Sequence, residues 1–526
     1  MARILTLLFI FLTAGALKGE ELLWPLPDHT YLTGGYADSR YDHFHGGVDI
    51  RTGGEHLAVL APADGKIERL AVTPSGYGKV VYFRMKNDTT AVFGHLDRFA
   101  PRLESIVRDS QLVAGTYRVD LIYEQRSDDL EFKRGETLAY TGETGRGAPH
   151  LHFELRKEAV QIDPLAAYPR EDTQPPVITE LRYIELQDLN LRSIGTKLSL
   201  VKDSDGNYST SAVRSNEPVA FLISCYDPGP WNRHAVPSAI RVIVDSDTVY
   251  ETFPTEIDLL GPKDIYAKLV WKQLVERDHD VRRLFTFPEI PIGKFPTKGW
   301  ITEVWDEQAE IEVEDRAGNK TSVQLKLSVD TSDRISGFYL EKGINSISQF
   351  SLTGNEEVVS WATLEMVSEH EVNVGDPLDG FSDRLVLTYS LLSDEDPEGL
   401  YWYKKSSKGR SALWTVPNEP DSIMSCYLQR GGVFGLARDT TPPKLLLSRD
   451  GRGFKFDLRD AETGIDDSTV RCTIDGITAI PEYEYEENGG AIWTRNTLTA
   501  GEHTIVFTAA NRAGVAKEWT VSMTLP

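Results

Sequence analysis

Short stretches in which apolar and polar residues alternate recur along this chain, and they predict β-strands. In HLHFEL, residues 150–155, the two histidines and the glutamate share one face of such a strand, and the apolar residues share the other, where they can enter a core. The runs KVVYFRM (79–85) and TAVFGHL (90–96) flank Asn87-Asp88, a turn signal for a β-hairpin. We therefore predict an antiparallel, mostly β fold for the N-terminal part of the chain.

Two phrases occur twice in the remainder of the chain. The opening phrase reads DTQPPVI from Asp172 and DTTPPKL from Asp439, and the closing phrase reads EDRAGNKTSVQLKLSV from Glu314 and ANRAGVAKEWTVSMTL from Ala510. A double proline does not fit a helix interior or a central strand, so the opening phrase predicts a linker that enters an edge strand. The closing phrase is a glycine turn followed by an alternating strand. Together the phrases enclose two similar units.

The unit at the C-terminus, residues 439–526, approaches the ~100 residues of a β-sandwich domain. The unit 172–330 is longer, and DIYAKLVWKQLVERD, within residues 263–283, has the spacing of a helical insertion. Residues 331–438 are rich in strand signals but lack both phrases. We therefore predict a mostly β protein, with an antiparallel domain over residues 20–171 followed by three Ig-like β-sandwich modules with these bounds.

The first residues, MARILTLLFIFLTAGALKGEE, combine an early arginine, the apolar run ILTLLFIFLT and a small-residue cleavage site, AGA. The run is shorter than the ~20 apolar residues that cross a bilayer as a helix. We predict a signal peptide over residues 1–19, and hence an exported protein, periplasmic or secreted, with no transmembrane segment in the mature chain. No cysteine follows the apolar run, so we expect no lipoprotein anchor.

The chain has 526 residues and a net charge of −24, from 80 acidic and 56 basic side chains. A protein that binds nucleic acid needs a basic face, so this charge argues against nucleic-acid partners. It also gives no support for docking on an anionic membrane. Cys225, Cys426 and Cys472 are few and far apart, which argues against a disulfide scaffold and favours buried free thiols over one bridge. None belongs to a C-x-x-C pair, so we expect no cysteine-ligated metal site.

Seven of the 11 histidines lie in the N-terminal part of the chain: His29, His43, His45, His56, His95, His150 and His152. In HFHGGVDI, residues 43–50, the glycine pair argues against a helix. It predicts a turn that runs into a strand, with Val48 and Ile50 facing inward and Asp49 on the opposite face. The imidazole of His45 and this carboxylate then come from one turn. A third ligand from His152 gives a His₂Asp set with an open fourth position, as in catalytic zinc sites.

Each of these features also has an explanation without chemistry. His150 and His152 would lie about 6.5–7 Å apart along a strand, so one can bind a metal ion while the other faces the same cavity. Taken alone, the pair is also explained as the polar outer face of an amphipathic strand. A lone His95 is explained as a core or surface histidine, and an acid–base role requires it to lie beside the metal. No H-E-x-x-H occurs, which excludes the helical zincin arrangement.

Taken in order, His45-x-x-x-Asp49, Gly94-His95-Leu96 and His150-Leu151-His152 resemble the motifs of the LytM/lysostaphin-type zinc metallopeptidases, which are peptidoglycan endopeptidases. Further segments support the resemblance in the same order: WPLP, APADGKIERL, YGKVVYF, KRGETLAYTGETGRGAPHLHFEL and IDPLAAY. The resemblance covers residues 24–168, about a third of the chain. As an ordered set, these motifs are highly specific.

The resemblance implies that His45, Asp49 and His152 hold one Zn²⁺ per chain, and that His95 and His150 flank the metal-bound water and the substrate carbonyl. One of these two would take the proton and the other would donate to the oxyanion; which does which stays open. The implied function is a zinc metalloendopeptidase that hydrolyses peptide crosslinks of bacterial peptidoglycan, with peptidoglycan peptide stems as its substrate. The β-sandwich modules are candidate binding sites for protein partners.

Two alternatives to this function remain. One is a non-hydrolytic cell-wall regulator or binding protein that retains the metallopeptidase fold, and the other is a peptidase acting on proteins. All five motif residues are intact, which favours catalysis over the first alternative. The choice between cell wall and protein as substrate depends on the family resemblance alone.

The chain also departs from the family pattern in an extra segment around residues 101–129, which leaves the shape of the groove and the substrate preference open. Arg40 and Arg51 flank the first ligands, and ion pairing is favoured there over gripping of a substrate carboxylate. Glu154 shares the face of His152, where it either supports that ligand or only pairs with neighbours of Arg156.

Overall fold

The computed structural model describes residues 22–123, 130–231, 234–253, 256–259, 264–286, 298–331, 344–354, 362–377, 379–418, 422–451 and 453–526. The predicted signal peptide, residues 1–19, lies outside the described residues. No helix within the described ranges is both long enough and apolar enough to span a bilayer. The described chain consists mostly of β-strands, as the alternating pattern predicts.

The N-terminal part of the chain forms one large antiparallel sheet. Its elements are β1 (Leu32–Gly34), β2 (Val48–Arg51), β3 (Ala58–Leu60), β4 (Gly65–Val72), β5 (Lys79–Met85), β6 (Thr90–Phe99), α1 (Pro101–Ala114), β7 (Val119–Ile122), β8 (Glu131–Phe132), β9 (Thr137–Thr141), β10 (His150–Lys157), β11 (Val160–Ile162) and the 3₁₀ helix η2 (Pro164–Ala167). The main strand order is β1-β2-β10-β6-β5-β4-β7. The predicted hairpin is confirmed as β5 and β6, and its turn places Asp88 at a φ of 62°.

One face of this sheet supplies the core of the N-terminal domain. Leu151, Phe153 and Leu155 of β10 are fully buried on it, as their alternation with polar residues predicts. The ring of Phe93 in β6 stacks on Phe153, with 5.4 Å between ring centroids. Each such side chain contributes about 2 kcal/mol through burial. The polar residues of β10 are thereby placed on the opposite face of the sheet.

Helix α1, in the extra segment, is not among the predicted elements. Its signals are nevertheless present: Pro101 occupies the first turn, and Gly115 ends the helix with a φ of 65°. Leu103 and Val107, four residues apart, are buried on its inner side.

The next part of the chain contains two sheets around a second core. Its elements are β12 (Val177–Glu185), η3 (Leu186–Asp188), β13 (Thr196–Leu198), β14 (Val201–Lys202), β15 (Tyr208–Ser209), β16 (Val213–Ser215), β17 (Val219–Tyr226), β18 (Ala239–Val244), β19 (Asp247–Thr252), β20 (Glu256–Asp258), α2 (Asp264–Lys268), α3 (Trp271–Arg277), β21 (Arg282–Arg283), β22 (Glu303–Glu314) and β23 (Lys320–Asp330). The sheet orders are β13-β12-β17-β21 and β14-β15-β23-β22-β18-β19, and both sheets contribute to one core. The helical spacing predicted within residues 263–283 is confirmed by α2 and α3.

The third part, between residues 346 and 438, also forms two sheets around a core. Its strands are β24 (Ser346–Ile347), β25 (Phe350–Thr353), β26 (Leu364–Ser368), β27 (Glu371–Val374), β28 (Gly380–Ser390), β29 (Leu400–Ser406), β30 (Gly409–Ala412), β31 (Thr415–Asn418), β32 (Ile423–Arg430) and β33 (Gly432–Arg438). The sheet orders are β24-β25-β28-β32-β31 and β26-β27-β33-β29-β30.

The last part, which we call the last sandwich, contains β34 (Lys444–Asp450), β35 (Gly453–Arg459), β36 (Ile465–Ile474), β37 (Ile477–Pro481), β38 (Gly489–Trp493), β39 (Gly501–Asn511) and β40 (Ala516–Leu525). These strands follow the order β34-β35-β38-β37-β36-β39-β40 around a fourth core. The three cysteines of the chain are free thiols, as the sequence predicts.

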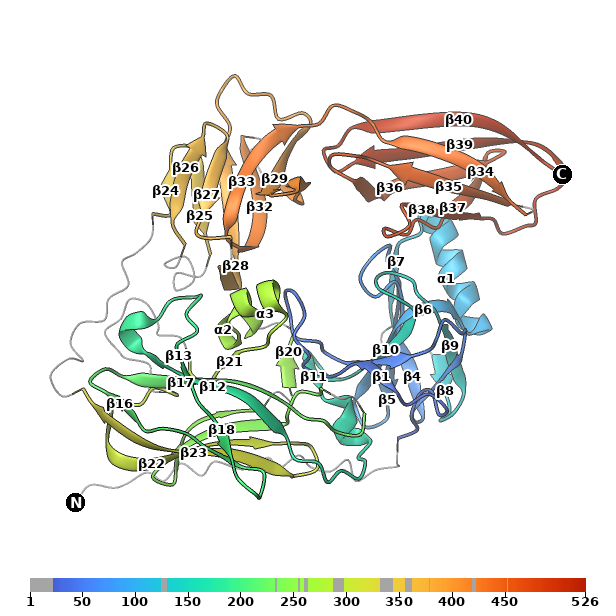
Figure 1. Ribbon diagram of the computed structural model, residues 1–526. Helices are drawn as coiled ribbons and strands as arrows, with labels where there is room; N and C mark the ends of the chain where they lie inside the picture. The colour runs from blue at the N-terminus through green and yellow to red at the C-terminus, as the bar shows by residue number, and fades with distance from the viewer. Residues whose placement is uncertain are drawn as a thin grey trace, which may run out of the picture.

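The four parts form a closed circuit of contacts (Figure 1). Strand β20 leaves its own module and pairs with β11 of the N-terminal sheet. Helix α2 packs against β28 of the third part, and the hydroxyl of Tyr401 in that part donates to Glu462 of the last sandwich. The last sandwich then returns to the N-terminal domain, where β37 lies beside α1 (Figure 1).

The repeated phrases meet in space within each of their two units. Asp315 and Asn511 hold equivalent places in the closing phrase, and each side chain accepts backbone N–H groups from residues two and four positions ahead. The amide of Asn511 donates to Asp439 of the opening phrase at 2.9 Å. In the earlier unit, the position of Asn511 is taken by Asp315, and its carboxylate lies beside those of Asp172 and Asp227.

This acidic group should make the stability of its module depend on pH. Burial raises the pKa of Asp227 to about 6, with a further contribution from the charge of Asp315. The folded state therefore binds a proton more readily than the unfolded state, so this destabilisation is present above pH 6 and disappears as the pH falls towards 4.

We expect Asp227→Asn to stabilise the protein at pH 7.5 in the presence of a chelator by about 2 kcal/mol, and to have a much smaller effect at pH 4.5. The amide oxygen can still accept the N–H of Gly229 that the carboxylate accepts now. Differential scanning calorimetry at both pH values measures the effect, with the exposed Asp247→Asn as control. Equal melting temperatures for both variants at pH 7.5 would contradict the prediction.

Candidate metal centre

The structure brings His45, Asp49 and His152 together on the polar face of the N-terminal sheet. Strands β2 and β10 pair so that Asp49 lies directly opposite His152, and Gly94 of β6 lies on the other side of that histidine. Val48 and Ile50 are fully buried, as predicted, which turns Asp49 outward from the core. His45 joins from the turn that precedes β2.

Three ligand atoms of these residues form a nearly regular triangle. Nε2 of His45 lies 3.1 Å from Nδ1 of His152. Oδ1 of Asp49 lies 3.0 Å from each of these nitrogens. All three side chains are largely buried, with residue exposures of 5–9%.

The opposite ring nitrogens fix the tautomers of both histidines. Nδ1–H of His45 donates to the carbonyl oxygen of Gly35 at 2.7 Å, and Nε2–H of His152 donates to Glu154 at 2.7 Å. In the neutral rings the nitrogens that face Asp49 therefore carry lone pairs, so three lone pairs converge on one point. Such an arrangement is stable only around a cation, which is either a proton or a metal ion.

The donor set fits a divalent transition metal. Imidazole nitrogen and carboxylate oxygen bind Zn²⁺ at about 2.0–2.2 Å, and a tetrahedral ion then needs donors about 3.4 Å apart. The observed spacings of 3.0–3.1 Å are close to that value. His45, Asp49 and His152 could thus hold such an ion from one side and leave the other side open.

Without a metal ion, a proton occupies this position. Burial disfavours a charged His152, but hydrogen bonds with Asp49 and Glu154 outweigh burial and raise its pKa to about 9. Burial likewise disfavours a charged Asp49, but the surrounding histidines His150, His152 and His45 hold its pKa well below the usual range. Oδ2 of Asp49 accepts Nη2 of Arg40 at 2.6 Å, so Arg40 forms the ion pair that the sequence favours. Arg51 is exposed at the end of β2.

Glu154 lies behind His152 at the centre of a buried network. Its side chain is fully buried. Besides the hydrogen bond from His152, it accepts hydrogen bonds from the hydroxyl of Tyr77 at 2.5 Å, from Nε of Arg156 at 2.6 Å and from Nε2 of Gln161 at 2.8 Å. Burial would raise its pKa, but His152 and Arg156 keep it well below the usual range. Of the two sequence alternatives, the contact with His152 agrees with the first, and Glu154 also pairs with Arg156 itself.

The network partners Tyr77 and Gln161 were not predicted from sequence. Tyr77 lies in the loop between β4 and β5, and Gln161 lies in β11. Tyr77 opens the segment YGKVVYF, but nothing in that segment assigns it a role, and Gln161 lies outside the quoted motifs. Each reaches Glu154 only through the pairing of distant strands.

His95 and His150 lie at the open side of the triangle. Their ring centroids are 4.5 Å apart, and Nε2 of His150 lies 3.4 Å from Oδ1 of Asp49. His95 has a φ of 60°, in the left-handed region that is costly for most residues with a side chain. Burial, together with the neighbouring His150, lowers the pKa of His95 to about 4, so the ring is neutral at pH 7.

Backbone carbonyl groups also fix the tautomers of these two rings. Nδ1–H of His95 donates to the oxygen of Thr144 at 2.9 Å, and Nδ1–H of His150 donates to the oxygen of Ala148 at 2.6 Å. Each neutral ring therefore presents Nε2 as an acceptor. The structure thus brings all five predicted residues to one place.

A second group in the described residues could also hold a cation. Carboxylate oxygens of Asp172, Asp227 and Asp315 lie within 4.8 Å of one another. This group lies where the opening and closing phrases meet and shares no residue with the histidine site.

Comparison with known proteins gives one family match. Residues 43–128 match the model of Peptidase family M23. An uncharacterized metalloprotease of Haemophilus influenzae is 30% identical over 122 residues, which are 23% of this chain and 20% of that protein. The murein hydrolase activator NlpD of Escherichia coli is 27% identical over 124 residues, which are 24% of this chain and 26% of that protein. The matches thus span about a fifth to a quarter of these curated relatives.

Solved structures similar to part of the chain include two peptidases. A zinc-containing peptidase from Vibrio cholerae is 22% identical, with a TM-score of 0.20, over 28% of this chain and 40% of that chain. The catalytic domain of lysostaphin from Staphylococcus simulans is 21% identical, with a TM-score of 0.18, over 26% of this chain and 88% of that chain.

The network around Glu154 predicts a measurable effect on metal binding. A carboxylate that orients a ligating histidine raises metal affinity, and its loss typically costs about 10–100-fold. We expect Glu154→Gln to weaken binding of Zn²⁺ by this factor, as measured by competition with a chromophoric chelator. Glu158→Gln, an exposed change of the same charge near the end of β10, should leave the affinity unchanged. Unchanged affinity in a Glu154→Gln protein that melts as the wild type does would contradict the role given to Glu154.

Proposed function

We propose that this chain, whose residues 43–128 match peptidase family M23, is an exported zinc endopeptidase that hydrolyses the peptide crosslinks of bacterial peptidoglycan. We assign His45, Asp49 and His152 as the ligands of one Zn²⁺, and His95 and His150 as the catalytic residues. Export, to the periplasm or out of the cell, is supported by the apolar run and small-residue site near the N-terminus.

The observation that carries this proposal is the convergence of three lone pairs beside two further histidines. A purely structural cluster has no need for two more rings with acceptor nitrogens at the open side of the triangle. Hydrolysis of a peptide bond has this need, since a proton must leave the attacking water and an oxyanion must be stabilised.

A bound Zn²⁺ would lower the pKa of a water ligand to about 7 and polarise the scissile carbonyl group. The remaining steps fall to this chain's own side chains. Either His95 or His150 can accept a proton through Nε2, because the carbonyl groups of Thr144 and Ala148 hold the proton of each ring on Nδ1. Once protonated, the same ring becomes a donor that can stabilise an oxyanion.

A second candidate function is supported by the names of relatives. Several proteins that match this chain are murein hydrolase activators, which points to regulation of another enzyme. In that case the histidine site would stabilise the fold or bind a partner. The five intact residues favour hydrolysis, since a regulator does not need His95 and His150 in addition to the metal ligands.

The proposal predicts metal-dependent cleavage of crosslinked muropeptides. Purified mature protein, incubated with muropeptide dimers, should release monomers detectable by mass spectrometry, and a zinc chelator should abolish the reaction until Zn²⁺ is restored. His152→Ala should lose both bound zinc and activity, whereas His29→Ala, which removes a histidine outside the five-residue site, should keep both.

The outcomes separate the alternatives. If dimers stay intact while the protein stimulates a separate peptidoglycan amidase, the regulator function is correct. Cleavage of a denatured protein but not of dimers would indicate a peptidase acting on proteins. Stoichiometric zinc in His152→Ala would show that the ligand assignment is wrong.

A further inference from the structure

A loop of the last sandwich lies against the candidate active site. We call residues 482–487, EYEYEE, the acidic loop; it connects β37 with β38. We call residues 142–149, GETGRGAP, the histidine loop; it leads from β9 to His150 at the start of β10. The two loops are more than 330 residues apart in sequence and contact each other directly.

Glu484 makes the central contact between the loops. Its Oε2 accepts the backbone N–H of Gly145 at 3.2 Å, and its Oε1 accepts the hydroxyl of Tyr117 at 2.6 Å. The backbone N–H of Tyr485 donates to the oxygen of Pro74, in the loop that also carries Tyr77, at 3.0 Å. Glu486 accepts the N–H of Gly147 at 3.4 Å. The acidic loop therefore holds two segments that border the site.

The histidine loop controls both proposed catalytic residues. The carbonyl group of Thr144 orients His95, and that of Ala148 orients His150. Gly145 and Gly147, one position away from these carbonyl groups, have φ values of 90° and 93°. Glycine has little intrinsic preference for a single backbone conformation. Contacts with other segments must therefore keep the carbonyl groups of the histidine loop directed at His95 and His150.

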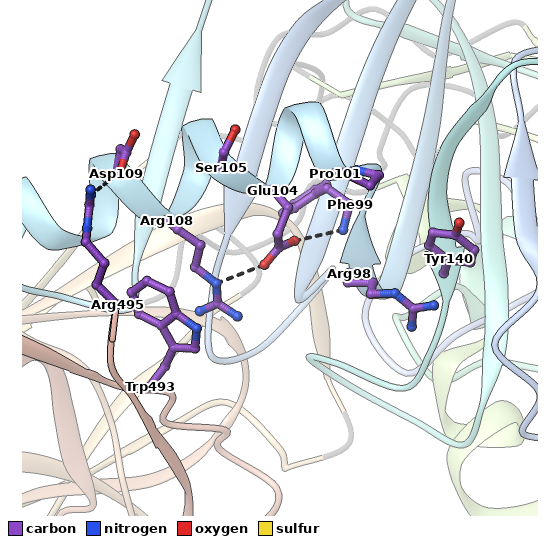
Figure 2. Close-up of a pocket in the computed structure, with 10 residues that line it drawn as sticks. All are labelled: Arg98, Phe99, Pro101, Glu104, Ser105, Arg108, Asp109, Tyr140, Trp493 and Arg495. Carbon is purple, nitrogen blue, oxygen red and sulfur yellow. Dashed lines mark hydrogen bonds and ion pairs between the residues drawn. The ribbon is translucent and has the colours of Figure 1, made fainter. Parts of the chain in front are cut away.

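Ion pairs fix the last sandwich in place around this contact. Arg108 of α1 pairs with Glu482 at 2.5 Å, and Arg118 pairs with Asp467 at 2.7 Å. Arg495 pairs with Asp109 of α1, and Trp493 lies beside Arg108 (Figure 2). A cavity of about 540 Å³ lies between α1 and this part of the sandwich. The contact thus combines these ion pairs with an apolar part, in which Ile480 and Trp493 of the last sandwich pack against the core of the N-terminal domain.

We propose that Glu484 is a positioning residue of the peptidase site: it fixes the histidine loop, and through the carbonyl groups of Thr144 and Ala148 it sets the orientation and tautomer of His95 and His150. The last sandwich then completes the active site. The expected effect of Glu484 on kcat rests on the proposed function, whereas its expected effect on the rings of His95 and His150 does not.

The metal ligands have a different support, which provides a built-in control. Tyr41, in the turn before His45, contacts Trp271 of α3, whose Nε1–H donates to its carbonyl oxygen at 2.9 Å. Arg430 of β32 lies 4.0 Å from the centroid of the Tyr41 ring. Since Glu484 contacts none of these residues directly, its loss should leave the affinity for Zn²⁺ unchanged.

The test compares Glu484→Ala, Glu484→Gln and the exposed Glu487→Ala in the full-length mature protein. We expect Glu484→Ala to lower kcat on muropeptide dimers about 10–100-fold, with KM and zinc affinity changed less than threefold. Glu484→Gln keeps an oxygen that can accept the N–H of Gly145, so it should recover most of the activity. Glu487→Ala should behave as the wild type. Thermal melting checks that each variant is folded.

A second readout does not depend on activity. In protein labelled with ¹⁵N-histidine, the ring-nitrogen signals of His95 and His150, assigned with His95→Ala and His150→Ala, report tautomer and hydrogen bonding. They should shift in Glu484→Ala and stay unchanged in Glu487→Ala. Unchanged signals in Glu484→Ala, or unchanged kcat in an active protein, would overturn the proposal. If the wild type cleaves no dimers, the proposed function fails and the ring signals alone decide whether Glu484 positions the histidines.

Discussion

The pairing of β2 with β10 determines whether the candidate metal centre exists. In this register Val48 and Phe153 face each other in the core, and one residue further along, Asp49 faces His152 on the polar side. A slip of one residue would send one member of the second pair into the apolar core, because side chains alternate between the faces of a strand. Burial of the apolar residues therefore holds the carboxylate and the imidazole opposite each other.

The elements that were best predicted from the sequence are those whose structure follows from a local pattern of apolar and polar residues. The hairpin of β5 and β6 follows from two alternating runs and a turn signal, and the strand of His150 and His152 follows from its own alternation. The five residues of the site could be selected because their motifs occur in the order known from one family, and a match to peptidase family M23 supports that resemblance. The bounds of the modules and the chemical roles of these five residues stay predictions.

What the sequence could not supply depends on contacts between distant segments. Glu154 was recognised as a neighbour of His152, but its bonds to Tyr77 and Gln161 arise only when β10 lies next to β11 and the loop after β4. Glu484 gave no signal at all, because an acidic run is usually a solvated surface. Helix α1 carried ordinary helix signals, but its position beside β37 is a property of the tertiary structure.

Because the four parts form a closed circuit of contacts, the interface between the last sandwich and the N-terminal domain can be weak and still form. The last sandwich is tethered to the N-terminal domain through two folded modules, so its docking is intramolecular and takes place at a high effective concentration. Most of the translational entropy of association is already lost when the chain folds. A few ion pairs, one loop and a small apolar contact around Ile480 can then suffice to hold the last sandwich against the N-terminal domain. The arrangement should also loosen as ionic strength rises, because exposed charge pairs are screened by salt.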